Sequence, residues 1–492
     1  MQIVKLVLKA ITAGNLLLAQ TQGVFTATGN MSAGRSVHTA TLLNDGKVLI
    51  AGGYQLIFNG VWNTLILASA ELYDPVTGTF TPTGNLTTAR YGHTATLLPN
   101  GKVLIAGGSA VEYDSLASAE LYDPSTGTFT ATGEMTVTRA WHTASLLNTG
   151  KVLIAGGIDG ADPQYVVRAN AELYDPTSGT FTATGNMIET HGHATATLLT
   201  NGKVLIDGEG DVRNGFLSNE QLYDPDTGTF SLTGGRAASS MYPEFSSMAV
   251  LLTNGRVLET LQYSLDTGQE AELYDPTTGA STTTGSLTTP RSNDSTATLL
   301  PDGTVLIAGK WFAGPPGAEL YDAVAGTFSP TGDLTASAGR LNHRATLLPD
   351  GTVLVSGGVG TGLVGSLASA ELYHPTALVG SPLLLSISEG GRGQGAIWHA
   401  ETGQVTSPSN PAVAGEALSM YTTSLADRGV IPPRVAVGEH LAEILFFGRA
   451  PGYPGFDQVN VRMPNGVAPG ATVPVRLTYL GRPSNEVTIA VQ

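Results

Sequence analysis

The sequence predicts an all-β protein in which a seven-bladed β-propeller is followed by a small β-sandwich. The composition favours this class, because 62 glycines and only 13% charged residues suit a turn-rich β-protein. Two markers count the blades. A tyrosine recurs at spacings of 47 to 52 residues, at Tyr73, Tyr122, Tyr174, Tyr223, Tyr274, Tyr321 and Tyr373. A turn glycine keeps pace with it, at Gly46, Gly101, Gly150, Gly202, Gly255, Gly303 and Gly351.

Each repeat is expected to form four short antiparallel strands, as the second repeat illustrates. The runs at 93–98 and 102–106 are separated by a Pro-Asn-Gly turn, a pattern that is typical of a β-hairpin. A third strand is expected at 117–122, and a fourth strand at 128–133 follows an Asp-Pro-Ser-Thr-Gly turn. One repeat therefore predicts one four-stranded sheet, which is one blade.

The repeat resembles that of kelch-type propellers. Its length of about 50 residues matches a kelch blade, and double glycines occur at Gly52-Gly53, Gly107-Gly108, Gly156-Gly157 and Gly357-Gly358. The seventh repeat has no fourth strand after Tyr373, whereas residues 23–30 resemble the fourth strand of the other repeats. We therefore expect the N-terminal strand to pair with the seventh blade and close a propeller over 23–375, which removes a free sheet edge.

The connections between strands predict two unlike faces. Short, nearly identical turns join the first and second strands and the third and fourth strands, whereas the second-to-third connections on the opposite face vary greatly. Variable loops on a rigid scaffold are where binding residues concentrate. The alternative is that their aromatic side chains simply pack on the rim. The candidate binding residues on this face are Tyr54, Trp62, Tyr113, Asp159, Tyr165, Arg168, Asp211, Arg213 and Trp311.

Two kinds of repeated polar residue have both a structural and a chemical interpretation. Histidines at the start of the innermost strand could bind a metal, but repetition favours hydrogen bonds between blades. Four histidines each follow an arginine by three residues, namely His38, His93, His142 and His343, and His193 lies one residue out of register. Glutamates two residues before the tyrosine could act as acid and base, but repetition favours inter-blade ion pairs with those arginines. No metal ligand and no catalytic residue is therefore assigned.

The last part of the chain predicts a second domain. A linker at 376–384 leads to residues 385–492, whose candidate strands at 434–437, 442–447, 458–463, 472–479 and 486–491 suggest a small immunoglobulin-like β-sandwich. The runs 393–397, 407–411 and 458–461 resemble a C-terminal domain of unknown function that ends many predicted exported acidobacterial proteins. This resemblance implies export, and no chemistry.

Charge and composition exclude several classes. A net charge of −16 without a basic stripe argues against a nucleic-acid partner. The chain has no cysteine, which excludes disulfides, thiol catalysis and cysteine-ligated metals. No apolar run reaches the length of about 18 residues that a membrane span needs. Residues 1–22 are expected to be a signal peptide or another N-terminal extension, because Lys5 and Lys9 precede the apolar residues 16–19.

The domain order resembles galactose oxidase and its copper-radical relatives, which pair a seven-bladed kelch propeller with an immunoglobulin-like domain. Those enzymes bind copper through tyrosines and histidines, and one tyrosine is cross-linked to a cysteine. That cofactor cannot form here, because the chain has no cysteine. The sequence therefore predicts a non-catalytic, secreted binding or scaffold protein without a cofactor, which presents its variable loop face to a glycan or a protein. The alternative is a metal-dependent oxidase-like enzyme with an altered cofactor.

Overall fold

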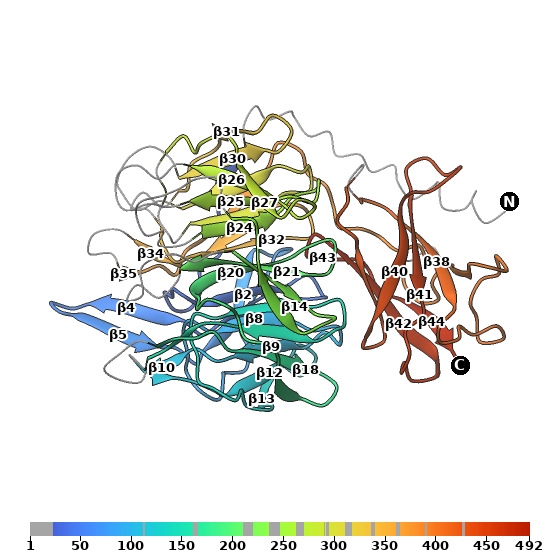
Figure 1. Cartoon of the computed structure of the whole chain (residues 1–492), viewed down its shortest axis with the longest axis horizontal. Coiled ribbons are helices and arrows are strands. Elements are labelled where there is room, and N and C mark those ends of the chain that lie inside the picture. The colour runs from blue at the N-terminus through green and yellow to red at the C-terminus, as the bar shows by residue number, and fades with distance from the viewer. Residues whose placement is uncertain are drawn as a thin grey trace.

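The regular elements of the protein are β-strands. The computed structural model describes residues 23–111, 114–160, 166–209, 220–235, 247–261, 270–289, 291, 295–309, 317–335, 340–360, 365–388, 391–425 and 429–492. Every regular element within these ranges is a strand, which confirms the all-β class (Figure 1). No helix in this described part is long and apolar enough to cross a membrane.

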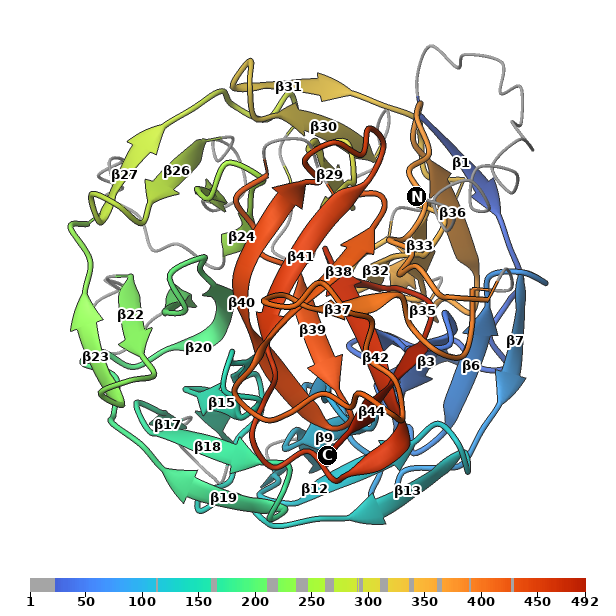
Figure 2. The same ribbon diagram turned by 90° about the vertical axis from the view of Figure 1, so that its right-hand side faces the viewer.

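Seven four-stranded antiparallel sheets surround a common axis, as predicted (Figure 2). The first three blades are β2 (Thr39–Leu42), β3 (Val48–Ala51), β6 (Ala70–Asp74) and β7 (Thr79–Pro82); β8 (Thr94–Leu97), β9 (Val103–Ala106), β12 (Ala119–Asp123) and β13 (Thr128–Ala131); and β14 (Thr143–Leu146), β15 (Val152–Ala155), β18 (Ala171–Asp175) and β19 (Thr180–Ala183). The fourth and fifth are β20 (Gly192–Leu198), β21 (Val204–Glu209), β22 (Gln221–Asp224) and β23 (Thr229–Leu232); and β24 (Ser247–Leu251), β25 (Val257–Leu261), β26 (Ala271–Asp275) and β27 (Ala280–Thr283). The sixth is β28 (Thr296–Leu299), β29 (Val305–Ala308), β30 (Ala318–Asp322) and β31 (Thr327–Pro330).

The N-terminal strand closes the ring. The seventh blade consists of β32 (Arg344–Leu347), β33 (Val353–Ser356), β36 (Ala370–His374) and β1 (Val24–Ala27). β1 pairs antiparallel with β36, so that Val24 lies opposite His374 and Ala27 lies opposite Glu371. The predicted closure is confirmed, and the seventh sheet gains the fourth strand that its own repeat lacks.

Packing between blades explains the repeated residues. In five blades the second strand, such as Val103–Ala106, is fully buried because sheets cover both of its faces. The repeated tyrosine is also fully buried, and in six blades its hydroxyl lies 2.8–3.0 Å from a threonine hydroxyl at the end of the preceding blade. These contacts satisfy a phenol that would otherwise be desolvated at a cost.

Some variable connections form hairpins of their own. These are β4 (Tyr54–Phe58) with β5 (Trp62–Ile66), β10 (Ser109–Val111) with β11 (Asp114–Ser115), β16 (Ile158–Asp159) with β17 (Val166–Val167), and β34 (Val359–Gly360) with β35 (Gly365–Ser366). The β4–β5 hairpin projects from the face of the ring opposite the C-terminal domain (Figure 1). We call this side the loop face.

The C-terminal domain lies against the other face of the propeller, over its axis (Figures 1 and 2). Its sheet has the order β37-β38-β41-β40-β39-β42-β43, and β44 also pairs with β42. The strands are β37 (Ile397–His399), β38 (Ala417–Thr422), β39 (Arg434–Val437), β40 (His440–Arg449), β41 (Asp457–Arg462), β42 (Gly470–Tyr479), β43 (Arg482–Pro483) and β44 (Val487–Val491). The sheet folds into a sandwich-like unit around one apolar core that includes Leu418, Val435, Val461 and Ile489. The five predicted strands are present, whereas β37, β38 and β43 were not predicted.

Candidate functional site

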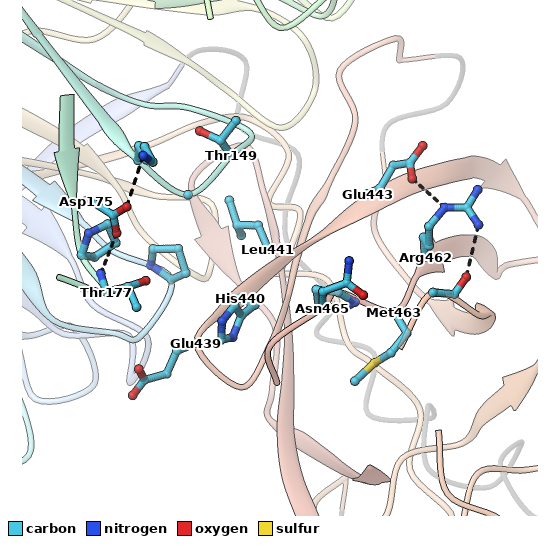
Figure 3. A pocket seen from close by; sticks show the side chains of 16 residues that line it. Thr149, Asp175, Thr177, Glu439, His440, Leu441, Glu443, Arg462, Met463 and Asn465 are labelled. Atoms are coloured by element: carbon cyan, nitrogen blue, oxygen red, sulfur yellow. Dashed lines mark hydrogen bonds and ion pairs between the residues drawn. The ribbon is translucent and has the colours of Figure 1, made fainter. Parts of the chain in front are cut away.

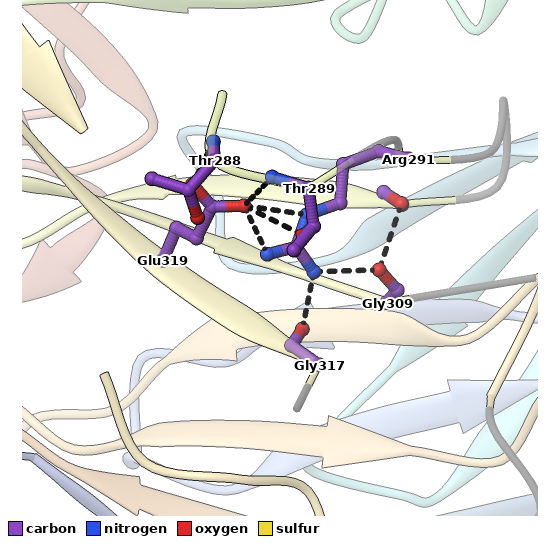
Figure 4. Close-up of polar contacts among 7 residues, drawn as sticks. Thr288, Thr289, Arg291, Gly309, Gly317 and Glu319 are labelled. Carbon is purple, nitrogen blue, oxygen red and sulfur yellow. Dashed lines mark hydrogen bonds and ion pairs between the residues drawn. The ribbon is translucent and has the colours of Figure 1, made fainter. Parts of the chain in front are cut away.

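Buried arginine–glutamate pairs anchor the connections that enter the blades. In five blades an arginine Nη2 lies 2.6–2.9 Å from a glutamate Oε1, and both side chains are at most 2% exposed. Figure 4 shows the pair of Arg291 and Glu319, in which Arg291 also donates to the Gly309 and Gly317 carbonyls. The ion pairing is confirmed, but each pair joins a connection to the third strand of the blade it enters, rather than two neighbouring sheets. The pairs are Arg35–Glu71, Arg90–Glu120, Arg139–Glu172, Arg291–Glu319 and Arg340–Glu371.

The repeated histidines make the hydrogen bonds between blades, as predicted. Their Nε2 atoms lie 2.9–3.1 Å from hydroxyls of the preceding blade, in the pairs Ser356–His38, Thr39–His93, Thr94–His142 and Thr296–His343. Burial lowers the pKa of all four, to about 3 for His142 and His343, so these imidazoles are neutral near pH 7. Each ring thus joins two blades through its Nε2 atom.

The residues at the position before the repeated histidine surround the loop-face end of the axis; in the fourth blade this residue is His193, and Ala194 follows it in place of the histidine. Val37, Gly92, Trp141, His193 and Asn342 all have φ between 49° and 63°. Backbone hydrogen bonds link several of them: Trp141 N–H donates to Gly92 O at 2.8 Å, and His193 N–H donates to Trp141 O at 3.1 Å. Non-glycine residues in this region are strained and persist where the surroundings fix them, which is common at ligand sites.

Four rings follow one another along this end of the ring, from the first blade to the fourth. Their centroids are 5.5 Å apart for Tyr54 and Tyr91, 6.1 Å for Tyr91 and Trp141, and 4.5 Å for Trp141 and His193. The first three side chains are half-buried, and His193 is exposed. We call these four residues the aromatic arc. It presents partly solvated aromatic surface that is held by a rigid scaffold, which is a suitable arrangement for binding.

Glycine is required beneath the arc. A Cβ on Gly92 would lie 3.0 Å from Cε2 of Trp141, and its φ of 63° already disfavours a side chain. The backbone of Tyr54 is fixed by reciprocal hydrogen bonds with Ser36 of 3.0 and 2.9 Å. The arc is therefore positioned by the connections between blades as well as by the variable loops.

The predicted binding residues lie in different parts of the structure. Tyr54 belongs to the aromatic arc, whereas Trp62 lies on the projecting hairpin and is 46% exposed beside Phe58. Asp159 and Arg168 form an ion pair with each other on the β16–β17 connection. The remaining candidates, Tyr113, Tyr165, Asp211, Arg213 and Trp311, lie outside the described residues.

Sequence reasoning missed three members of the arc: Tyr91, Trp141 and His193. A signal was present. In four repeats the outer residues of the pattern Arg-x-x-His are constant and the two middle ones vary, as in Arg90-Tyr-Gly-His93 and Arg139-Ala-Trp-His142. Variation inside an otherwise fixed motif marks side chains that the scaffold does not need.

The fourth and fifth blades depart from the repeat. Glu220 stands where other repeats have alanine, and Glu259 stands where most have isoleucine. With Glu272 they form a buried cluster whose carboxylate oxygens lie within 4.8 Å of one another. Ser281, in place of the usual phenylalanine, donates to Glu220 at 3.3 Å. Such an oxygen-only set suits a hard cation or a basic side chain rather than copper.

A cleft lies between the propeller and the C-terminal domain. It has a volume of about 390 Å³ and is lined by propeller turns and by residues 439–441 and 462–465 (Figure 3). Its charged side chains are largely paired, since Lys151 lies 3.2 Å from Asp175 and Arg462 lies 2.8 Å from Glu443. His440 lines this cleft, and His399 is paired with Glu416 at 2.8 Å elsewhere in the domain. The arrangement is that of a domain junction.

Comparisons with known proteins agree with this fold. Residues 89–136 match the kelch motif family. A solved structure described as a novel fungal alcohol oxidase with catalytic diversity among the AA5 family, in complex with copper, aligns over 96% of this chain and 100% of that chain, with a TM-score of 0.59 and 16% sequence identity. No curated protein matches the chain. The chain thus has the fold of a seven-bladed propeller followed by a C-terminal β-domain, with a kelch motif at residues 89–136. At this identity the likeness establishes the fold alone.

The residues of this chain do not fit the copper-radical centre of galactose oxidase. The tyrosine–cysteine cross-link has no cysteine to form it. Among the residues that the structure describes, the repeated histidines are engaged between different blades, and the one cluster of potential ligands contains only carboxylates. No step of an oxidation is therefore derived from this site.

Proposed function

We propose that the protein is a non-catalytic, secreted binding protein whose aromatic arc binds a glycan. The observation that carries the proposal is the arc itself, in which Tyr54, Tyr91, Trp141 and His193 come from separate blades and meet on one face. Sugar rings combine apolar C–H faces with hydroxyl groups, so flat aromatic surface beside polar groups suits them. Export rests on the resemblance of residues 393–492 to the end of exported proteins.

Two members of the arc have strained backbone, as residues at ligand sites often do. Left-handed backbone at a non-glycine residue costs of order 1 kcal/mol, and Trp141 and His193 both adopt it. The equivalent position in the second blade is Gly92, which adopts it without that cost. Val37 and Asn342 adopt the same conformation outside the arc, so this strain is a feature of the repeat that the arc shares.

A glycan array tests the proposal. The full-length protein is applied to immobilised neutral and acidic oligosaccharides, together with Trp141→Ala and the control Trp62→Ala on the projecting hairpin. We expect the wild type and the control to bind the same glycans, and Trp141→Ala to bind at least tenfold more weakly. Wild-type protein that binds no glycan, or equal binding by Trp141→Ala, would contradict the proposal.

The copper-oxidase architecture supports the alternative function, an oxidase-like enzyme with a different cofactor. An assay for hydrogen peroxide, with copper-incubated protein and primary alcohols or sugars as substrates, distinguishes the binding function from the oxidase function. Binding without turnover supports the proposal. Turnover that follows the copper content of the protein would replace it with the oxidase.

A further inference from the structure

A chamber lies on the propeller axis where the C-terminal domain covers it. Its volume is about 580 Å³, and it is lined by the innermost strands of five blades and by β39, β40 and β42. The propeller side is lined by an alanine of each inner strand, at Ala40, Ala95, Ala144, Ala196 and Ala345, and by the leucine two residues later in each strand. The volume is within the range of roughly 300–1,000 Å³ that is usual for small-molecule sites.

The charge of the chamber is opposite to that of the protein. The chain has 40 acidic and 24 basic residues, yet the charged residues among the described lining are two arginines, Arg434 and Arg476, with no carboxylate. Arg476 is neutralised by an ion pair with Glu486. Arg434 is therefore the cation that determines the charge of the chamber.

Arg434 has a neutral partner but no anionic one within the described part of the chain. Its Nη2 donates to the Leu146 carbonyl at 2.7 Å, which fixes the guanidinium across the junction between the domains. Burial lowers the pKa of Arg434 to about 10, and the shift has no other cause. Arg434 is half-buried, and a partly desolvated cation without a counter-charge carries a cost that an incoming anion would offset.

Arginine suits one kind of anion in particular. Its planar fork matches a carboxylate through two parallel hydrogen bonds, and one face of the chamber offers apolar surface from Leu441, Leu480 and the alanines. We propose that the chamber binds a small organic carboxylate. The carboxylate group of this ligand would lie at Arg434, and its apolar part would lie along the alanines of the chamber wall. This site is on the opposite side of the propeller from the aromatic arc and does not depend on the function proposed there.

Isothermal titration of the full-length protein with octanoate tests the site. Octan-1-ol serves as the uncharged probe of the same length. We expect one octanoate per chain, with octan-1-ol at least tenfold weaker because it leaves Arg434 without a counter-charge. Arg434→Met should weaken octanoate binding at least tenfold, whereas Arg449→Met, at the distal end of β40, should leave it unchanged.

A second variant keeps the test decisive if Arg434→Met does not fold. Ala144→Leu adds apolar volume to the chamber wall without touching the charge, and it should abolish octanoate binding by occupying the space. Absence of binding at 1 mM octanoate (about 4 kcal/mol of binding free energy), equal binding of octan-1-ol, or unchanged binding by both chamber variants would each overturn the proposal.

Discussion

The second blade and the fifth blade have the same four strands but different interiors. In the second blade an ion pair joins Arg90 to Glu120, and the hydroxyl of Tyr122 is bonded to Thr83. In the fifth blade, Glu259 and Thr260 replace an isoleucine and an alanine of the repeat, and among the described residues the Tyr274 hydroxyl has no hydrogen-bond partner. The comparison teaches that the residues shared by all repeats stabilise the ring, whereas residues that differ from the repeat mark positions with a role other than stability.

Removing an arginine from a regular blade should have the largest effect. Arg90→Met leaves the Glu120 carboxylate buried without its cation, and we expect it to lower the free energy of unfolding by about 3–5 kcal/mol. In the fourth blade the equivalent pair is neutral, His191 with Gln221 at 2.7 Å. His191→Leu should therefore cost less, about 1–3 kcal/mol. Urea denaturation measures both.

The double variant Arg90→Met/Glu120→Leu sharpens this comparison. It removes both charges, so it should recover part of the stability that Arg90→Met alone loses. No recovery would show that Arg90 stabilises the blade through its bonds to the Gly107 and Ser118 carbonyls, of 2.7 and 3.0 Å, rather than through its ion pair.

Acid should weaken the regular blades through their histidines. The pKa of His142 is about 3 in the folded protein and near 6.5 when unfolded, so the unfolded chain binds the proton first as the pH falls. The stability contribution is complete above pH 6.5 and is lost progressively towards pH 3, by up to about 1.4 kcal/mol per pH unit for one such histidine. His142→Gln should flatten the slope of unfolding free energy against pH between 4 and 6. An unchanged slope would contradict the burial account.

Phenylalanine variants of the equivalent tyrosines in the second and fifth blades should differ in stability by a smaller amount. Tyr122→Phe removes the bond to Thr83 and should cost about 1 kcal/mol. Tyr274→Phe removes a hydroxyl whose pKa is raised to about 12 by burial and by the Glu220 and Glu259 charges, and which has no described hydrogen-bond partner. It should be neutral or stabilising. Equal losses in the two variants would show that the fifth blade is built like the others.

The last change alters the glycine that supports the arc. Gly92→Ala adds a methyl group 3.0 Å from the Trp141 indole at a left-handed position, and we expect it to cost about 1 kcal/mol of stability. It should also weaken glycan binding, because the indole must move. Weaker stability with unaltered binding would separate Trp141 from the ligand site.

Much of the fold could be predicted because each blade repeats its signals. The tyrosine, the turn glycine and the missing fourth strand after Tyr373 together predicted seven blades and their closure by β1. In the C-terminal domain the alternating strands were predicted, whereas the two-residue β43 and the three-residue β37 carry too few residues for a periodic pattern.

The sites were harder to predict because they are assembled from distant segments. Trp141 and Tyr91 lie about 50 residues apart and meet only because neighbouring blades place the same repeat position side by side. Arg434 has an ordinary strand sequence around it, and only the position of β39 over the axis makes it a half-buried cation that lines the chamber. Local patterns identify the scaffold, whereas these contacts between blades and between domains require the structure.

The most direct test of the account follows the indole N–H signals of the four tryptophans by TROSY NMR during titration with a glycan selected on the array. Substitution of each tryptophan by phenylalanine assigns the signals. The account predicts that the Trp141 signal shifts, while that of Trp398, in the C-terminal domain, stays in place. A shift of Trp398 with an unmoved Trp141 would contradict the claim that the aromatic arc is the binding site.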